Sequence, residues 1–494
     1  MAISHYKNIQ PLWEGIFLLS IKMIYFILLL NYFNIFISPL IFALTIYIYH
    51  TIIYYIYGLK ALSGFDKVFL TTSPVGRYQI TSLSRYNKNF DVEKFGKFLK
   101  ERIVIPFSRY HSRLVKKNME YFWYEDPDLE KACNSIVKLS PRRKNFEDAL
   151  EFVAQEINNH IDIFNEYPYE LNMVPFGEDS GICLFKYDHL LVDGLGIIAS
   201  LCLAGDNFSE NTYPKIIKMM KEPNIFQTLY LYLSAPLFGF ITLIQFALYG
   251  DRKCPFKANK KPLSEDTIFV LSKNYKLKDF EKYRKENKVS FNDIMLCSFS
   301  VAMKNTLKKY DEYKNYKNLI IDLPVGRKKP ENTIEKMNKN INNEASGIIV
   351  NMPLVDSVDD INIIKKSIRK NMRPEKIFAV GMTADILGNI FSWHIISYFA
   401  KLFTKRFDYM FTNVPGPAEK LYYYGIEVSD MYVFPSAGGG LPYVAILSYN
   451  DQFKIALNSN KNADCDIKEL LYEYEKALEK FIIEVFLNLM NYLC

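Results

Sequence analysis

The stretch Tyr187-Asp188-His189-Leu190-Leu191-Val192-Asp193-Gly194 links a strand-like apolar run, residues 181–185, to a short apolar segment, residues 195–203. A neutral imidazole that titrates near pH 7 is a natural base for a hydroxyl proton, so His189 is a candidate general base. Asp193 suits a structural part in which it folds back to hold the loop, and Gly194 allows backbone geometry that other residues avoid. The same residues also fit a buried histidine before an ordinary Asp-Gly turn. Taken alone, the stretch leaves both interpretations open.

Six other segments decide between these interpretations. They are Leu62-Ser63-Gly64-Phe65-Asp66-Lys67-Val68-Phe69-Leu70, Phe122-Trp123-Tyr124-Glu125-Asp126-Pro127-Asp128, Tyr167-Pro168-Tyr169-Glu170-Leu171, Ser290-Phe291-Asn292-Asp293, Thr412-Asn413-Val414-Pro415-Gly416-Pro417 and Ser448-Tyr449-Asn450. Each is similar to a motif of the wax ester synthase/diacylglycerol acyltransferase family, and they follow one another in that family's order. From Ala61 to the C-terminus the chain therefore resembles this family.

The resemblance implies a fold, an activity and a set of site residues. The fold would be the two-domain α/β fold of coenzyme A-dependent acyltransferases of the chloramphenicol acetyltransferase type, with the catalytic histidine in a channel between the halves. Its members transfer a long-chain acyl group from acyl-coenzyme A to diacylglycerol or a long-chain fatty alcohol, which gives triacylglycerol or a wax ester. His189 would be the general base, Asp193 and Gly194 would support and shape its loop, and Asn292 and Asn413 are candidates for contacting the substrate or the oxyanion.

The same resemblance sets the expected ligands and leaves two alternatives. Acyl-coenzyme A would be a co-substrate, the lipid alcohol the other substrate, and membrane lipids the surroundings, with no metal and no permanently bound cofactor. Another hydroxyl such as a sterol stays open as the acceptor. A non-catalytic membrane subunit that keeps the fold also stays open, since a fold does not prove an activity.

One residue departs from the family pattern. The family usually carries two adjacent histidines, and Asp188 takes the place of the first. A neighbouring carboxylate would raise the pKa of an imidazole if their side chains approached. Neighbours on a strand point to opposite faces, so we expect Asp188 to face away from His189.

Length, charge and cysteine usage limit the class of protein. The 494 residues suit two core-bearing halves. The net charge of +7 is dispersed, and no zinc-finger or RNA-binding motif points to nucleic acid. Seven cysteines without a Cys-x-x-Cys pair predict reduced thiols in a cytosol-facing protein. The chain has no P-loop and no Gly-x-Ser-x-Gly elbow, which disfavours nucleotide-driven chemistry and serine hydrolysis.

The N-terminal region predicts a membrane anchor. Between Ile16 and Gly58 the only charged side chain is Lys22. This length suffices for two crossings of about 20 residues each, or for one hairpin that dips into a leaflet, with its turn within residues 31–39. The stretch is too long for a signal peptide. Basic residues that follow it favour a catalytic body on the cytosolic side, at the endoplasmic reticulum or a lipid droplet.

Two later apolar runs are weaker candidates for membrane contact. Residues 224–250 could form a third span, an interfacial helix or a helix that covers an acyl-binding groove. A full crossing would separate the two halves, so we expect an interfacial or re-entrant helix. Residues 377–403 contain Asp385 and His394 and predict one amphipathic helix. We expect His394 to be a satisfied polar group or a surface residue.

The predicted organisation is a tail (1–15), the anchor (16–58), an N-terminal acyltransferase half (61–215), a crossover with the apolar helix (216–262) and a C-terminal half (263–494). Expected strands are 78–83, 181–188, 267–271, 319–323 and 347–352, with a hairpin of 443–447 and 453–457. Expected helices are 92–103, 146–157, 277–286, 294–307 and 467–489. Ser290 and Asp293 predict a capping box. The polar residues 328–343 predict a flexible surface loop.

Overall fold

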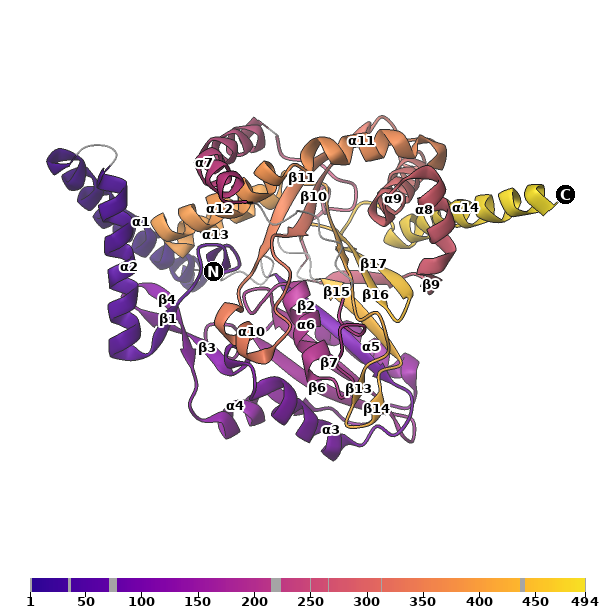
Figure 1. Cartoon of the computed structure of the whole chain (residues 1–494), viewed down its shortest axis with the longest axis horizontal. Helices are drawn as coiled ribbons and strands as arrows, with labels where there is room; N and C mark the ends of the chain where they lie inside the picture. The colour runs from indigo at the N-terminus through magenta and orange to yellow at the C-terminus, as the bar shows by residue number, and fades with distance from the viewer. Residues whose placement is uncertain are drawn as a thin grey trace.

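The computed structural model describes residues 2–33, 37–70, 78–214, 224–248, 250–264, 266–311, 313–435 and 440–493. Figure 1 shows two α/β regions, with the helices α1 (Ala2–Tyr32) and α2 (Ile37–Tyr57) at the left. α1 begins at Ala2, so within these ranges residues 2–15 continue the first apolar helix and do not form a separate tail.

The first region is built on a five-stranded sheet. Its order is β15 (Asp430–Pro435), β2 (Gln79–Tyr86), β7 (Ser180–Asp188), β6 (Tyr169–Phe176) and β5 (Val137–Leu139). A small sheet of β1 (Leu59–Ala61), β4 (Glu120–Glu125) and β3 (Ser112–Lys117) lies beside α2. The helices are α3 (Val92–Phe98), which continues as a π-helical turn (Leu99–Val104), α4 (Leu129–Ile136), α5 (Phe146–Asn158) and α6 (Gly194–Ala204).

The second region contains the larger sheet. Its order is β11 (Ala345–Pro353), β10 (Asn318–Gly326), β12 (Tyr409–Val414), β16 (Tyr443–Tyr449), β17 (Gln452–Asn460) and β8 (Thr267–Leu271), and β9 (Tyr275–Lys276) also pairs with β17. Its helices are α8 (Glu281–Asn287), α9 (Phe291–Leu307), α11 (Ile361–Asn371) and α14 (Ile467–Leu493). A short ladder of β13 (Tyr422–Tyr423) and β14 (Ile426–Glu427) precedes β15.

Local sequence explains several of these elements. The predicted capping box is present at the start of α9, where Ser290 Oγ accepts the Asp293 amide and Asp293 Oδ2 accepts the Ser290 amide. The predicted hairpin is β16–β17, and Asn450 and Asp451 at its turn have φ values of 49° and 58°, as such turns require. β7 also forms where the sequence predicts a strand.

The two regions are interlocked. β15 belongs to the C-terminal part of the chain, yet it pairs antiparallel with β2, from Asp430 opposite Arg85 to Pro435 opposite Ile80. One hydrophobic core also contains residues of both parts, including Phe95, Tyr110, Met337 and Ile341. Because of these contacts the halves share a core, and the junction between them is held from both sides.

Two expectations about the second half are wrong. Residues 328–343 are not a flexible surface loop, because they contain α10 (Ile334–Asn340), and Met337 and Ile341 are buried in the shared core. Thr333 caps this helix by accepting the Lys336 amide at 3.3 Å. Polar composition concealed the element, since a short helix needs only a few apolar anchors.

Residues 377–403 form two helices and not one. α12 (Pro374–Ile390) ends where Phe391 adopts an extended conformation, and α13 (Trp393–Thr404) starts anew. The polar side of α12 is turned into the body, because Asp385 Oδ1 accepts the Phe65 amide at 3.0 Å. His394 is also buried, and among the described residues its ring nitrogens have no hydrogen-bond partner, contrary to the expected satisfied or exposed histidine.

The predicted membrane anchor forms two long apolar helices. Trp13–Tyr32 of α1 and Ile37–Tyr57 of α2 are long and apolar enough to cross a membrane, by length and composition alone. The expected turn between them includes Asn34, which lies outside the described residues. The later run forms α7 (Ile225–Leu248), which packs along α12.

Candidate active site

The candidate base His189 lies in the loop between β7 and α6. β7 pairs with β2 on one side and β6 on the other, so it is an inner strand of its sheet. The His189 amide donates to the Tyr78 carbonyl at 2.8 Å, which extends the pairing one residue beyond the β7–β2 ladder. The loop that carries the imidazole is thus attached to the sheet at its first residue.

Asn343, from the chain that follows α10, holds this imidazole. Its Nδ2 donates to Asp66 Oδ1 at 2.7 Å and to the His189 carbonyl at 3.0 Å. Two acceptors around one nitrogen fix the orientation of the amide, so Asn343 Oδ1 faces His189 Nδ1 at 3.1 Å as the acceptor. The Nδ1 of His189 then carries the proton, and Nε2 is left with the free lone pair that a general base needs.

Asp66, which accepts from Asn343, lies beside a positively charged side chain. It is fully buried, and its Oδ2 lies 3.7 Å from the Arg109 guanidinium. The guanidinium stacks over Trp123 at 4.2 Å from the ring centroid, and it donates to the Ile341 carbonyl at 2.9 Å. A buried carboxylate needs such partners to stay charged. An ion pair therefore joins Arg109 to Asp66, and hydrogen bonds continue from Asp66 through Asn343 to His189.

The surroundings of His189 keep its ring neutral. Phe69 stacks on the imidazole with 4.4 Å between ring centroids and 18° between planes. Burial lowers the pKa of His189, and this effect outweighs Asp193, Asn343 and Asp66, which raise the pKa. A lowered pKa means that the imidazole is unprotonated at neutral pH, which is the state that can accept a proton.

Asp193 ties the histidine loop to the C-terminal part of the chain. Its Oδ1 accepts the Gly196 amide at 2.9 Å and so caps α6, while its Oδ2 accepts the Glu344 amide at 2.9 Å. Burial raises the pKa of Asp193, and the two amides oppose this effect. The carboxylate thus holds residues 193 and 344 together, directly beside the contact between His189 and Asn343.

Gly194 has a different role from the one expected. Its φ is not in the left-handed region, so special backbone geometry does not explain the glycine. A Cβ at this position would lie 3.3 Å from Val414 Cγ2, which is tighter than ordinary contact. The glycine lets the start of α6 approach the end of β12, and this approach brings the two halves together.

Asn292 and Asn413 are brought together at this junction. Asn413 Nδ2 donates to Asn292 Oδ1 at 2.6 Å, and Asn413 precedes the residue that packs on Gly194. This bond orients the pair and leaves the Nδ2 of Asn292 without a hydrogen-bond partner among the described residues. The structure thus gathers all five candidate site residues, in that His189, Asp193 and Gly194 share one loop and the asparagines adjoin it.

Asp188 is buried at the end of β7. Its Oδ1 accepts the Leu190 amide at 2.9 Å, so the carboxylate turns back on the chain beyond the histidine. The carboxylate therefore has a local structural partner of its own. Its effect on activity stays a prediction.

Sequence reasoning missed the residues that hold the imidazole. Asp66 and Phe69 stand in the segment that resembles the opening of the family, so their position in a motif was a signal, although no role could be assigned to them. Asn343 gave no such signal, because it is one of several asparagines in a polar run. Its contact with His189 joins positions 154 residues apart.

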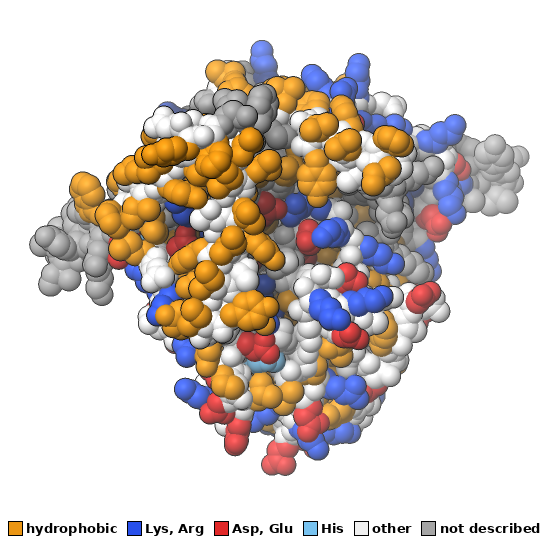
Figure 2. Space-filling model, turned by 60° about the vertical axis from the view of Figure 1, so that its left-hand side comes forward, with side chains coloured by type: hydrophobic (Ala, Val, Ile, Leu, Met, Phe, Trp, Pro, Cys, Tyr) orange, Lys and Arg blue, Asp and Glu red, His pale blue; other side chains and the backbone are white. Residues whose placement is uncertain are grey.

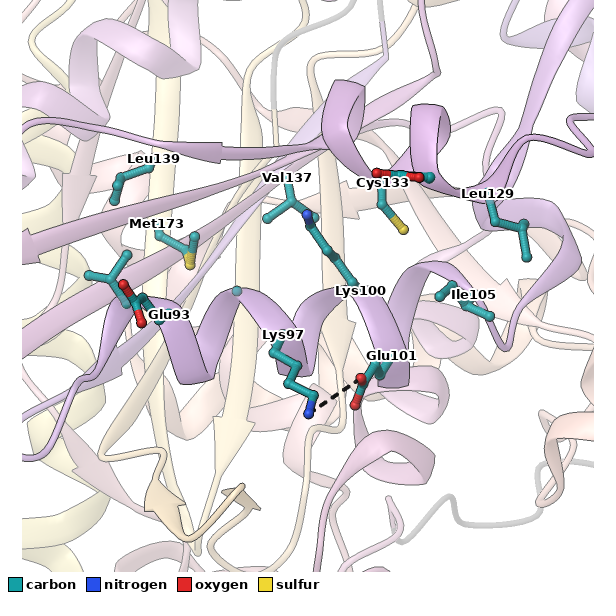
Figure 3. A pocket seen from close by; sticks show the side chains of 13 residues that line it. Glu93, Lys97, Lys100, Glu101, Ile105, Leu129, Cys133, Val137, Leu139 and Met173 are labelled. Carbon is teal, nitrogen blue, oxygen red and sulfur yellow. Dashed lines mark ion pairs between the residues drawn. The ribbon is translucent and has the colours of Figure 1, made fainter.

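Other hollows and clusters do not overlap this site. A hollow of about 630 Å³ lies beside α3 and α4, is lined by Lys97, Lys100, Cys133 and Met173 among others, and contains none of the site residues. Figure 3 shows these lining side chains. Within the described ranges no group of histidine, cysteine and carboxylate side chains could hold a metal ion. The six cysteines described there are buried, and none of them forms a disulfide bond.

Comparisons with known proteins agree with this geometry. Residues 341–481 match the family model described as the WS/DGAT C-terminal domain. The O-acyltransferase WSD of Acinetobacter baylyi is 22% identical over 395 residues, which are 73% of this chain and 83% of that protein.

Two solved structures share the fold. The wax ester synthase/diacylglycerol acyltransferase of Marinobacter aquaeolei VT8 is similar with a TM-score of 0.56 and 19% identity, over 86% of this chain and 99% of that chain. The starter condensation domain of rhizomide synthetase, in complex with C8-CoA, is similar with a TM-score of 0.55 and 11% identity, over 86% of this chain and 94% of that chain. The fold is therefore the expected α/β fold of coenzyme A-dependent acyltransferases, and residues 341–481 of the chain match the C-terminal domain of wax ester synthase/diacylglycerol acyltransferases.

Proposed function

We propose that this protein is an acyl-coenzyme A-dependent O-acyltransferase that acts on a lipid alcohol. The observation that carries the proposal is the hydrogen bond between His189 Nδ1 and Asn343 Oδ1, made in a loop with the His-x-x-x-Asp-Gly pattern. It provides a neutral imidazole of fixed tautomer at the junction of two halves. The named activities of the relatives and the C8-CoA bound to one solved neighbour support the same class.

The reaction follows from the geometry of the base. Nε2 of His189 takes the hydroxyl proton as the alcohol oxygen attacks the thioester carbonyl carbon. The tetrahedral intermediate then expels the coenzyme A thiolate, and the imidazolium returns the proton to the sulfur. Asn343 keeps Nδ1 protonated throughout, and Asp66 stabilises the imidazolium through the amide of Asn343.

The oxyanion requires a donor placed in advance. We assign this part to the Nδ2 of Asn292, whose orientation is fixed by the hydrogen bond from Asn413. A donor of this kind is typically worth about 3 kcal/mol in the transition state. Asp193 and Gly194 support the loop and do not exchange protons with the substrate.

The acceptor is proposed to be diacylglycerol or a long-chain fatty alcohol, at a membrane surface. Long-chain acyl groups and lipid alcohols partition into bilayers, and two apolar helices precede the enzyme body. Triacylglycerol or a wax ester would be the product. The second candidate, a non-catalytic subunit with the same fold, would not need the intact hydrogen bonds from Asp66 through Asn343 to His189.

The direct test is an acyl transfer assay. Purified membranes carrying the protein are given labelled acyl-coenzyme A and a panel of diacylglycerol, fatty alcohols and a sterol, with His189→Ala as the inactive variant. His394→Leu is the matched control, because His394 is a second buried histidine and makes no hydrogen bond among the described residues. Transfer by the parent and by His394→Leu but not by His189→Ala supports the proposal. No transfer to any alcohol would favour the non-catalytic subunit.

A further inference from the structure

Polar side chains within both helices attach the N-terminal hairpin to the body. Lys22 of α1 donates to Glu120 Oε1 at 3.0 Å and to the Asn389 carbonyl at 3.3 Å. On α2, His50 Nε2 lies 3.8 Å from Glu120 Oε2, and the Tyr49 hydroxyl accepts from Asn118 at 3.3 Å. The charged side chain within the apolar stretch is thus turned toward the body.

The contact on the body is a polar turn that cannot lie in hydrocarbon. Residues 116–120 form the turn of the β3–β4 hairpin and sit between α1 and α2. Lys116 and Asn118 remain exposed there, and Lys116 pairs with Glu14 at 2.6 Å. If both helices crossed a bilayer over their full apolar lengths, this turn would lie near its centre. An exposed lysine at that depth is strongly unfavourable.

Beyond these contacts a tip of the hairpin projects from the body, as Figure 1 shows at the upper left. From Lys22 to Tyr32 the helix rises about 15 Å, and from Ile37 to Tyr49 about 18 Å, at 1.5 Å per residue. Residues 23–48 carry no charge. The tip is braced internally, since the Tyr25 hydroxyl lies 2.9 Å from Thr45 Oγ1 and the rings of Phe26 and Phe42 lie 5.5 Å apart.

The length of the tip matches one leaflet. The hydrocarbon core of a bilayer is about 30 Å thick, so one leaflet is about 15 Å. The outer side chains of the tip, such as Ile24, Leu28, Leu40 and Leu44, are exposed and apolar. The tip can therefore fill one leaflet, and it is too short to reach the far side.

The outer face of α7 continues this surface. Its exposed apolar side chains recur every three or four residues, namely Leu229, Leu233, Leu237, Phe240, Ile244 and Leu248. The opposite face is packed on α12, where a Cβ on Gly239 would lie 1.8 Å from Thr383 Oγ1. In Figure 1 α7 and the tip both lie at the upper left, and Figure 2 shows hydrophobic side chains gathered over this side.

We propose that α1 and α2 enter a single leaflet as a hairpin and that the outer stripe of α7 lies in the same interface. The partner of this surface is the acyl layer of one lipid leaflet. This inference rests on the membrane association proposed above, but not on catalysis. A protein anchored in this way can bind the phospholipid monolayer around an oil droplet, whereas two crossings need a second aqueous face.

The test compares a monolayer with a bilayer. Purified full-length protein is incubated with triolein droplets coated by phosphatidylcholine, and separately reconstituted into phosphatidylcholine vesicles, and bound protein is recovered by flotation. We expect binding to both. Protein that enters vesicles but is excluded from droplets would overturn the single-leaflet hairpin and leave the proposed activity standing. Binding to neither would overturn membrane association.

Charge substitutions locate the surface. Leu40→Lys with Leu44→Lys in the tip, or Leu233→Glu with Leu237→Glu on α7, should each lower droplet binding about 10-fold or more. Leu139→Lys is the matched control, because Leu139 is 58% exposed on β5 whereas Leu40 is 71% exposed in the tip. Equal losses in the control, or none in the paired variants, would overturn the assignment. Thermal melting in detergent establishes that each variant is folded, and transfer to a soluble alcohol in detergent reports catalysis separately.

Discussion

The histidine loop and the segment of residues 328–344 meet at the same site, yet their sequences differ greatly in what they disclose. The loop carries its chemistry in consecutive residues, so a base and its supporting carboxylate could be named at once. The segment is a run of lysines and asparagines without an evident pattern. It nevertheless supplies Asn343, which is 2% exposed and fixes the tautomer of the imidazole.

The difference teaches which kind of information a motif contains. The reacting group and its immediate loop are encoded locally, while the groups that orient it come from distant parts of the chain. Asp66 and Arg109 contribute from the first region and Asn343 from the second. The following experiments ask whether the orienting groups matter as the structure suggests, beginning with the loop itself.

Removal of the imidazole should have the largest effect. His189→Ala removes the base, and we expect acyl transfer to fall by about 10²–10⁴-fold. Expression and membrane association should be unchanged, because the anchor and α7 make no use of this side chain. Steady-state rates with acyl-coenzyme A and a lipid alcohol measure the loss. Rates within a few-fold of the parent would show that the base lies elsewhere.

Removal of Asn343 should have the second largest effect on activity, and it tests the contribution of residues 328–344. Asn343→Ala leaves the imidazole free to rotate and to adopt the other tautomer, so we expect kcat to fall by about 10–10³-fold with little change in KM. The hydrogen bond from Nδ1 raises the pKa of His189, and its loss lowers that pKa further. Activity needs the neutral ring and is lost as pH falls through its pKa. The acid limb of the pH profile should therefore move to lower pH.

The parent enzyme provides the reference for that shift. Because burial lowers the pKa of His189, its acid limb should lie below about 6.5, the ordinary value for histidine. Asn340→Ala is the matched control, since this exposed neighbouring asparagine donates to Glu331 and contacts none of the groups that hold His189. A merely structural role for Asn343 would lower the amount of folded enzyme and leave the acid limb in place.

Much of the fold was accessible from the sequence for the same local reasons. β7, the capping box at Ser290 and the β16–β17 hairpin each depend on residues within one element or turn. The pairing of β15 with β2 was not predictable in this way, because it depends on contacts between distant segments. The break between α12 and α13 was missed for a related reason, since apolar periodicity continues across it.

In the candidate site, too, the residues could be named from the sequence, whereas the contacts between them could not. His189 and Asp193 could be named from one motif, and Asn292 and Asn413 from resemblance, whereas their mutual contact required the fold. The reason given for Gly194 was wrong, because close packing against Val414 and not a left-handed backbone requires the glycine. One sequence does not show which residues of the other half pack against Gly194.

Asp193 tests the point where the loop and the segment are tied. In Asp193→Asn one amide oxygen can still cap Gly196, but the new NH₂ faces the Glu344 N–H that the carboxylate now accepts. A buried unsatisfied donor costs about 1–3 kcal/mol of stability. We expect a lower midpoint in thermal melting and a several-fold lower kcat. An unchanged midpoint together with a strongly shifted pH profile would make Asp193 a participant in proton transfer.

Substitutions of Asp188 should have the smallest effect on activity. They test whether a residue that is next to the histidine in sequence also acts on it in space. Its carboxylate accepts the Leu190 amide, whereas the His189 imidazole contacts Asn343. Asp188→Asn keeps an oxygen for that amide, so we expect rates within about twofold of the parent and an unshifted acid limb. Asp188→His restores the residue usual in the family and should leave activity equal or higher. Complete loss of transfer in Asp188→His, with Asp188→Asn still active, would mean that this chain has rebuilt its site around an acceptor at position 188. In that case the local sequence of the histidine loop would determine more of the site than the comparison with residues 328–344 indicates.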